Sequence, residues 1–520
     1  MSVILRIDAG EPDGVRLRTE PLGVYAGLGG RALASRIVSA EVAPHSHPLG
    51  SANRLVLAPG LLSGTGALSG RLSIGCKSPL TDSLSVTSVG GPAARSLARL
   101  GYGAVIMEGR PAREGFHIVV MDKSGARVES AGDLRGLSVV EVGRRLRERH
   151  GAAASVIAVG GAGERRMAAS VVSALDESRR PARHIGRGGA GAVMGAKGIK
   201  ALVVDPAGCP DLAAVWPQSM ADADAALRGM LRRSRLDQAS RTLPHRGGEP
   251  DADGLLTSAV DPTAAGDGTP SAAGPTFGCR NCTAAGCPDI FSGDAGSSGR
   301  PDFDAVWVFS EVCGIVDAEA VVALVALAGE YGLDVTELGI ALRVAMEAGI
   351  VPFGDVRGAL ELVRDVGAGR GVGHILGAGA AVSATCLGIE TVFVEGSAKS
   401  GCGCLWSAKQ LELSRTLRIA AAALETLGYC RFVSFTVLER PEVLQAMVDV
   451  VNAVFGLVMS AEEVVSLAQD VLRIEGDFNR RSRLGAGWER PAPFSPYWPQ
   501  SPYGALFEAS RPDREHMYEA

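Results

Sequence analysis

Short apolar runs, interrupted by glycine, proline or serine, recur throughout the first 205 residues of this 520-residue chain. Examples are RLVLAP at 54–59, GAVIMEG at 103–109 and IKALVVD at 199–205. Runs of this kind, bounded by turn-forming residues, are typical of strands. Segments with helical spacing, such as GGRALASRIVSA at 29–40, lie between them. The pattern predicts a strand-rich α+β fold for this part of the chain.

The rest of the sequence changes character twice. Residues 206–277 are rich in Gly, Pro, Ala, Asp and Thr, the composition of a long exposed excursion. Later segments repeat apolar residues every three or four positions between an acidic start and a glycine, as in DAEAVVALVALAGEYG at 317–332. Ser460 and Glu463 form a capping-box pattern before another such segment. We therefore expect helices up to residue 482, and no internal repeat stands out.

Charge and hydropathy exclude several classes of protein. The net charge of −5 and the pI of 6.0 argue against a nucleic-acid-binding protein, which would show a basic footprint. No apolar run reaches the length of a membrane span, about 18 residues. The start, MSVILRIDAG, lacks the basic and apolar regions of a secretory signal. We expect a cytoplasmic protein that binds neither membranes nor nucleic acids.

Three of the ten cysteines lie within nine residues, in GCRNCTAAGC. Cys279, Cys282 and Cys287 have the spacing C-x2-C-x4-C, which suits zinc or an iron–sulfur cluster and leaves either one ligand short. Disulfides are not expected in a reducing compartment. The missing sulfur ligands have two candidate sources, the pair Cys402 and Cys404, or Cys430 in LETLGYCRF.

Two blocks, at residues 64–109 and 183–205, combine glycine-rich turns with arginines. Glycine leaves backbone N–H groups open to phosphate oxygens, and a nearby arginine adds a bidentate clamp. Each block taken alone is also explained by tight turns in a β-rich domain. The second block is not a Rossmann fingerprint, because no ribose-binding acid follows at the expected distance. It is not a P-loop either, because Lys197 is followed by Gly198 and not by Ser or Thr. Two such blocks favour a large ligand with several phosphates.

Together these blocks resemble one family, the aldehyde ferredoxin oxidoreductases, which are tungsten or molybdenum bis-pyranopterin enzymes. The resemblance covers most of residues 1–435 and rests on an ordered series of segments. These are ILRID, YAGLGGRALASRI, SGRLSIGCKSPLT, GYGAVIMEG, GRGGAGAVMGAKGIKAL and LGYCRF.

The resemblance implies a multidomain α+β fold. A strand-rich pterin-binding domain would span residues 1–207, and two mainly helical domains would follow at 208–390 and 391–520. It also implies a metal held by two pterin (molybdopterin) dithiolenes, with Mg²⁺ bridging their phosphates, and a [4Fe–4S] cluster. The positions that match phosphate- or magnesium-binding residues are Arg71, Ser88 (where Asn is usual) and Gly90, and in the second block Arg183, His184, Gly186 and Arg187.

The family also has two Asp-x-x-Gly-Leu-(Asp/Cys) motifs, one for each pterin. In GEYGLD, Leu333 and Asp334 match, whereas Gly329 replaces the first Asp. In ETLGYC, Glu425 replaces that Asp and Tyr429 replaces Leu. We refer to these two segments as the first and second pterin motifs.

The last residue of the second pterin motif is Cys430, which the resemblance makes the fourth ligand of the cluster. The implied set is Cys279, Cys282, Cys287 and Cys430. The final gap in the triplet is one residue longer than is usual in the family.

The implied reacting centre departs from the family. Asp304, in RPDFDAV, matches a glutamate near the metal, and we expect it to transfer protons; a helix-start acid is the alternative interpretation. The family's active-site histidine has no counterpart in the contracted stretch GSAKSGCGCLWSAKQ.

The predicted function is oxidation of an aldehyde-like small molecule to the acid, or the reverse, with electrons passed to ferredoxin or a small iron–sulfur protein. The alternative is a specialised biosynthetic reductase or oxidoreductase with a non-aldehyde substrate on the same scaffold. A third hypothesis is a zinc-stabilised binding protein without catalysis. The resemblance does not decide between tungsten and molybdenum, and a homodimer is one candidate assembly.

Overall fold

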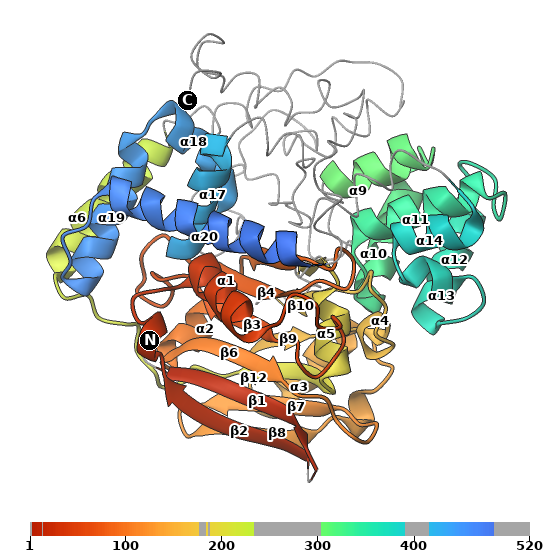
Figure 1. The fold of residues 1–520 in the computed structure, drawn as a ribbon, viewed down its shortest axis with the longest axis horizontal. Coiled ribbons are helices and arrows are strands. Elements are labelled where there is room, and N and C mark those ends of the chain that lie inside the picture. Colours follow the sequence, from red (N-terminus) through yellow and green to blue (C-terminus); the bar gives the residue numbers. More distant parts are fainter. Residues whose placement is uncertain are drawn as a thin grey trace.

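The structure is a computed structural model that describes residues 3–12, 14–175, 184–185, 188–232, 303–389 and 415–482 (Figure 1). Two six-stranded sheets form the first part of the chain, and two groups of helices stand on the same side of them. The prediction of a strand-rich domain followed by helices is confirmed.

The first sheet is mixed. Its strands are β1 (Val3–Glu11), β2 (Gly14–Pro21), β3 (Leu55–Pro59), β4 (Leu72–Lys77), β5 (Leu84–Val89) and β6 (Tyr102–Glu108), accompanied by the turn η1 (Gly23–Tyr25), α1 (Gly30–Glu41) and α2 (Ala93–Arg99). The strand order is β2-β1-β6-β3-β4-β5. In this sheet β1 and β6 pair in parallel, and the other neighbouring strands pair antiparallel.

The second sheet repeats this arrangement. Its strands are β7 (His117–Asp122), β8 (Gly125–Ser130), β9 (Ser155–Ala158), β10 (Val172–Ala174), β11 (His184–Ile185) and β12 (Ile199–Val204), accompanied by the turn η2 (Gly132–Leu134), α3 (Val139–His150), α4 (Gly161–Glu164) and α5 (Ala190–Ala196). The order is β11-β10-β9-β12-β7-β8, and β7 and β12 are the parallel pair. When the first sheet is followed from β2 and the second from β8, the strands have the same order and connections. The domain therefore contains an internal repeat.

The sequence did not predict this repeat. Equivalent strands such as β6 and β12 share apolar character and pairing partners but little residue identity. Strand pairing depends on backbone geometry and on the inward-facing pattern, and both tolerate wide substitution.

An apolar cluster with members from both sheets joins them. Leu57 and Ile74 of the first sheet and Val119 and Leu202 of the second belong to this cluster, and each is at most 2% exposed. Burying one such side chain contributes about 1.5–3 kcal/mol. The two halves of the repeat therefore share one core.

The helices form two groups (Figure 1). One contains α9 (Phe303–Trp307), the π-helical turn η3 (Val308–Val312), α10 (Ala318–Tyr331), α11 (Val335–Glu347), α12 (Val356–Ala368), α13 (Gly373–Gly377) and α14 (Ala380–Leu387). The other contains α6 (Pro217–Arg232), α17 (Arg415–Leu427), the turn η4 (Arg431–Val433), α18 (Ser434–Glu439), α19 (Glu442–Phe455) and α20 (Ala461–Arg481).

Each group has its own apolar core. Helix α6 follows the first domain in sequence but packs on α19, so spatial grouping and chain order differ there. The domain limits of 207 and 390 stay predictions.

Helix ends follow the sequence signals. Asp317 caps the N-terminus of α10, and Gly332 ends it in the left-handed conformation, with φ 70°. At α20, Ser460 and Glu463 form the expected capping box.

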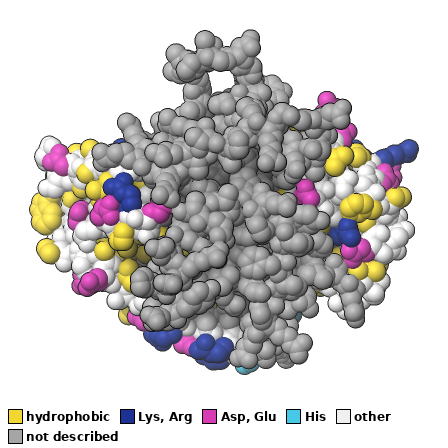
Figure 2. All heavy atoms as spheres, turned by 90° about the horizontal axis from the view of Figure 1, so that it is seen from above, with side chains coloured by type: hydrophobic (Ala, Val, Ile, Leu, Met, Phe, Trp, Pro, Cys, Tyr) yellow, Lys and Arg dark blue, Asp and Glu magenta, His cyan; other side chains and the backbone are white. Residues whose placement is uncertain are grey.

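Figure 2 shows described side chains on the two flanks of this face. Hydrophobic, acidic and basic side chains of described residues are mixed there on both flanks. Among the described residues, no helix has both the length and the apolar character needed to cross a membrane.

Lys197 joins the two halves of the repeat. This residue ends α5 of the second half and is 1% exposed. Its Nζ donates to the carbonyl oxygens of Gly50, Asn53 and Gly109 at 3.0, 2.7 and 2.9 Å. A single amino group thus lies within hydrogen-bond distance of three carbonyl oxygens from the first half.

Replacing Lys197 by methionine should lower the free energy of unfolding by about 2–4 kcal/mol, because each buried acceptor that loses its donor costs about 1 kcal/mol or more. Urea unfolding monitored by circular dichroism measures the difference. Lys123→Met, at an exposed position, is the control and should leave the midpoint unchanged. Equal midpoints for both variants would contradict the assigned role of Lys197.

Candidate functional site

The second pterin motif lies against the loop that joins β3 to β4, residues 60–71. The N–H groups of Leu61 and Leu62 donate to the carbonyls of Thr426 and Leu427, at 3.1 and 3.0 Å. A side chain on Gly60 would place its Cβ 2.1 Å from the Cα of Gly428. The two backbones therefore touch, and glycine is required for that contact.

The first pterin motif lies against the equivalent loop of the second sheet, residues 160–171 between β9 and β10. The Asp334 N–H donates to the Ala169 carbonyl, and the Val171 N–H donates to the Gly332 carbonyl, both at 2.9 Å. A Cβ on Gly160 would lie 2.2 Å from the carbonyl oxygen of Tyr331. The two halves of the repeated domain thus hold one motif each, in the same way.

Within the first pterin motif, Leu333 is fully buried and bridges to Ser170. Asp334 caps α11, and its Oδ1 accepts from the N–H groups of Thr336 and Glu337 at 2.9 and 3.0 Å. Capping of this kind holds the carboxylate at a helix N-terminus.

In the second pterin motif, Glu425 is 1% exposed and bound by two arginines. Its Oε2 accepts from Arg31 of α1 at 2.8 Å, and its Oε1 pairs with Arg431 of η4. Arg31 also binds both oxygens of Glu475 in α20 at 2.9 and 2.6 Å, and Ser35 donates to Glu475 at 2.6 Å. We call Arg31, Glu425, Arg431 and Glu475 the arginine–glutamate network.

The network keeps Glu425 ionised. Burial by itself would raise the pKa of Glu425, but the charges of Arg431 and Arg31 and the hydroxyl of Ser88 outweigh it, and the pKa falls below its usual value. A carboxylate so strongly paired is a fixed anion at any pH near neutrality.

Tyr429 and Cys430 complete this motif. Tyr429 is 1% exposed, and its hydroxyl has no hydrogen-bond partner among the described residues. Burial raises the pKa of its phenol, so the group stays neutral. Cys430 is 4% exposed and immediately precedes η4.

Arg71 and Ser88 lie close to the second pterin motif. The Arg71 N–H donates to the Gly428 carbonyl at 3.1 Å, and its side chain is buried. Ser88 of β5 stands opposite Ser73 of β4 and beside Glu425. Gly90 follows β5 in the turn before α2. The structure thus brings these predicted residues to one side of the first domain.

The second predicted phosphate segment is described only in part. His184 lies in β11, and its backbone pairs with Ser173 of β10. Gly188 and Gly189 follow, with φ 80° and 79°, and a Cβ on Gly188 would lie 2.8 Å from the hydroxyl oxygen of Ser85. This segment therefore approaches β5 of the other sheet. Arg183, Gly186 and Arg187 lie outside the described residues.

Asp304 belongs to α9, directly before the π-helical turn η3. π-Helical turns are rare overall, but those that occur are often found at functional sites. The sequence pattern did not predict this one. Cys279, Cys282 and Cys287 lie outside the described residues, as do Cys402 and Cys404.

Comparison with known families bears on this geometry. The model of the aldehyde ferredoxin oxidoreductase N-terminal domain matches residues 4–206, and the model of domains 2 and 3 of the same family matches residues 271–399. The matches together span more than half of the chain. The chain belongs to the aldehyde ferredoxin oxidoreductase family.

Curated relatives of this family member include the tungsten-containing aldehyde ferredoxin oxidoreductases of Pyrococcus furiosus and Pyrococcus horikoshii. The first is 28% identical over 344 residues, which are 62% of this chain and 54% of the relative. The second is 28% identical over 355 residues, which are 64% and 56%. The chain matches about half the length of these relatives.

A solved structure has the same fold as almost the whole of this chain. It is the active-site complex BamBC of benzoyl coenzyme A reductase in complex with 1,5-dienoyl-CoA. The TM-score is 0.73 at 17% identity, and the match covers 98% of this chain and 94% of that one. The predicted fold class is confirmed.

The residues present fit the two pterins of the family. Buried hydroxyl oxygens without a hydrogen-bond partner among the described residues lie at both motifs: Ser73 opposite Ser88, Ser170 bridging Leu333, and Thr336 after Asp334. A buried hydroxyl without a hydrogen bond lowers the stability of the fold. The ring nitrogens and N–H groups of a pterin could form the missing hydrogen bonds. For the cluster, Cys430 is the described thiol of the predicted set.

Sequence reasoning missed Arg31, Arg431 and Glu475 as members of this site. Arg31 stands in the quoted segment YAGLGGRALASRI, and Arg431 directly follows Cys430. The pairing of Arg31 with Glu425 spans 394 residues of chain, and no local pattern reveals a pairing over that separation.

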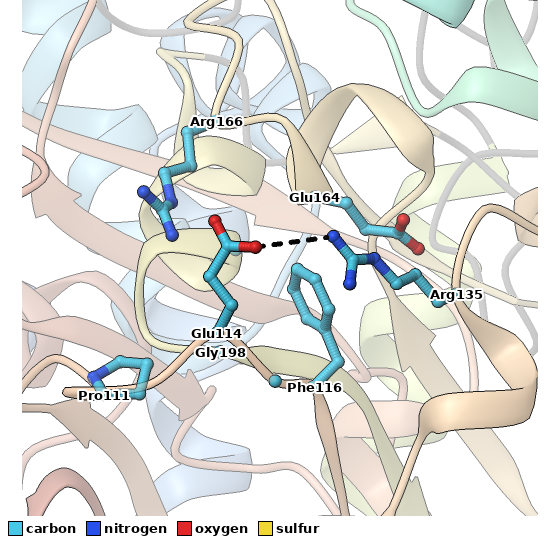
Figure 3. A pocket seen from close by; sticks show the side chains of 9 residues that line it. Pro111, Glu114, Phe116, Arg135, Glu164, Arg166 and Gly198 are labelled. Atoms are coloured by element: carbon cyan, nitrogen blue, oxygen red, sulfur yellow. Dashed lines mark ion pairs between the residues drawn. The ribbon is translucent and has the colours of Figure 1, made fainter.

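A separate hollow lies on the first domain. Arg135, Arg166, Glu114 and Phe116 are among the residues that line it, and Figure 3 shows Arg135 and Glu114 pointing toward each other as an ion pair at 3.7 Å. None of the predicted site residues lines this hollow.

Proposed function

We propose that this family member is an oxidoreductase with a tungsten or molybdenum bis-pyranopterin centre and a [4Fe–4S] cluster. It would oxidise an aldehyde-like substrate to the acid, or catalyse the reverse. Oxidation adds the oxygen of one water molecule to the substrate and releases two electrons and two protons. Ferredoxin or a small iron–sulfur protein would accept those electrons one at a time.

One observation supports this proposal most directly. The two loops that occupy equivalent places in the repeated domain, 60–71 and 160–171, each contact one of the two predicted pterin motifs. Two equivalent loops are suited to bind two equivalent ligands, such as two pterins. Zinc, nucleotide and simple structural interpretations offer no reason for this duplication.

The protein's own residues have separable roles in this proposal. Arg71, with Ser88 and Gly90, would bind a pterin phosphate or its magnesium ion at the second motif, and Arg183, His184, Gly186 and Arg187 would do so from the other block. Leu333, Asp334, Glu425 and Tyr429 would contact the pterins. The pterin centre supplies the two-electron chemistry when bound, and the fold orients it and excludes water.

Cys279, Cys282, Cys287 and Cys430 would ligate the cluster. Asp304 would accept or donate the substrate proton, as a carboxylate next to a reacting group does. Both assignments stay proposals.

A second candidate function has an observation in its favour. A solved structure with the same fold over 98% of this chain is an active-site complex of benzoyl coenzyme A reductase, at 17% identity. This favours a reductase that acts on a non-aldehyde substrate, such as an aromatic acyl thioester.

Protein purified without oxygen from a host supplied with both metals should contain tungsten or molybdenum and about four iron atoms per chain. Adding aldehydes should then reduce a viologen dye. Dye-dependent reduction of an aromatic acyl thioester, with no aldehyde activity, would replace the first candidate by the second. A colourless protein that contains zinc alone would overturn both.

A further inference from the structure

The hollow on the first domain contains an arginine side chain that no other described residue binds (Figure 3). The Nε atom of Arg166 is buried and has no hydrogen-bond partner among the described residues, and its guanidinium forms no ion pair with them. A buried donor without an acceptor destabilises a fold, so native structures rarely leave one unmet. The unpaired Nε therefore indicates that an acceptor from outside these residues, water or a ligand, belongs in the hollow.

The backbone also places Arg166 in an unusual conformation. Its φ is 60°, and Asp82 alone shares a positive φ among the described residues other than glycine. A non-glycine residue in the left-handed region is strained, and such residues cluster at functional and ligand-binding sites. The N–H of Arg166 donates to the Gly163 carbonyl at 2.9 Å, which closes the turn. The fold thus accepts strain at the residue whose side chain lines the hollow.

The Glu114 carboxylate lies between the guanidinium groups of Arg166 and Arg135 in the view of Figure 3. It pairs with Arg135 at 3.7 Å, and the side chains of Glu114 and Arg135 are 79% and 61% exposed. An exposed ion pair at this distance contributes little to stability. The Glu114 carboxylate is therefore held weakly, and the carboxylate of another molecule can take its place with little loss.

Glu164, the second acid of the hollow, already has its partners. Its side chain is 7% exposed and pairs with the buried Lys200. Its two oxygens also accept from the N–H of Gly136, at 3.1 and 2.9 Å. Because these contacts compensate the charge of Glu164, this acid does not neutralise the arginines. With Glu114 displaced, the two arginines carry the uncompensated charges of the hollow.

We propose that the hollow binds a small organic carboxylate. The carboxylate group lies between Arg135 and Arg166, since guanidinium groups bind carboxylates through paired N–H donors. The apolar part of the ligand contacts Phe116 and Pro111, which also line the hollow. The hollow has a volume of about 310 Å³ with its open mouth included, at the small end of the range for ligand pockets. None of the predicted pterin-binding residues lines it, so the inference goes beyond the proposed function.

Butyrate and butyramide are the probes, because they share an apolar chain and differ in charge. A ligand that binds the folded protein raises its unfolding midpoint with concentration, and this dependence gives an apparent Kd. Thermal unfolding of the purified full-length protein, followed by circular dichroism at constant ionic strength, measures that midpoint. Butyrate should raise the midpoint, and butyramide should not.

Three variants in the hollow test the role of each charge. Arg166→Gln should weaken butyrate binding about tenfold, because it removes a charge-assisted hydrogen bond. Arg135→Gln should weaken binding by a smaller factor, since the Arg135 side chain is more exposed. Glu114→Gln should strengthen binding, because it removes the competing carboxylate. Arg357→Gln on α12, where the side chain is 89% exposed, is the matched control and should leave the apparent Kd unchanged.

Opposite effects of Glu114→Gln and of the arginine variants support the inference, because loss of structure would weaken binding in every variant. Unchanged butyrate affinity in both arginine variants overturns it, as does a wild-type midpoint that butyrate does not raise. Inorganic phosphate that depends on both arginines and binds more tightly than butyrate overturns the choice of a carboxylate. If Arg166→Gln does not fold, the opposite shifts of Arg135→Gln and Glu114→Gln, both at exposed positions, decide the question.

Discussion

Replacing Cys430 by serine should remove the visible iron–sulfur absorbance and abolish electron transfer to the dye. Cys430 immediately precedes η4 and is buried in an apolar cluster that includes Leu62 and Leu68, where water cannot replace a lost sulfur ligand. A change in an outer-shell partner already costs about 10–100-fold in metal affinity or activity, so loss of a ligand should cost at least that much. Iron content and aldehyde-dependent dye reduction measure the effect.

Cys386→Ser is the matched control, because Cys386 is an exposed thiol on α14. It should keep wild-type iron content and activity. A Cys430→Ser protein with full iron content would show that another residue supplies the fourth ligand, and the role of Cys430 would then reduce to packing.

The sequence predicted those parts of the fold that depend on local signals. Glycine-bounded apolar runs became the strands of two sheets, and the Asp317 and Ser460 caps start helices where the pattern placed them. The order of strands in each sheet and the internal repeat were not predicted. They depend on pairing between residues far apart in the chain, such as Ile4 with Ala104.

The site shows the same division. The resemblance marked Glu425 and Asp334 as contacts for the pterins, and the structure places each motif against its own loop of the first domain. The sequence analysis did not predict that Arg31 and Arg431 bind Glu425. Both arginines lie in segments that served as evidence for the family resemblance. The ion-pair partners of a buried charge can lie far away in the sequence, and the spacing of residues along the chain does not reveal them.

Adding a single methyl group at Gly60 or Gly160 should damage the enzyme more than most core substitutions. The new Cβ would lie 2.1 Å from the Cα of Gly428 in the first case and 2.2 Å from the carbonyl oxygen of Tyr331 in the second. Since the obstructing atoms are backbone, each pterin motif must move away from its loop. Forced overpacking costs about 1–3 kcal/mol, and a displacement of about 1 Å can lower a rate about 100-fold.

Gly132→Ala is the control, because the nearest atom to its Cβ would be the Ser130 hydroxyl oxygen at an ordinary 3.7 Å. We expect Gly60→Ala and Gly160→Ala to retain less tungsten or molybdenum than this control and to lose activity to a similar degree. Similar losses follow from the equivalence of the two loops, since each holds one of two like ligands of one metal. If only one variant loses metal, the two halves of the repeat do not share the binding equally, and the duplication no longer supports a paired cofactor.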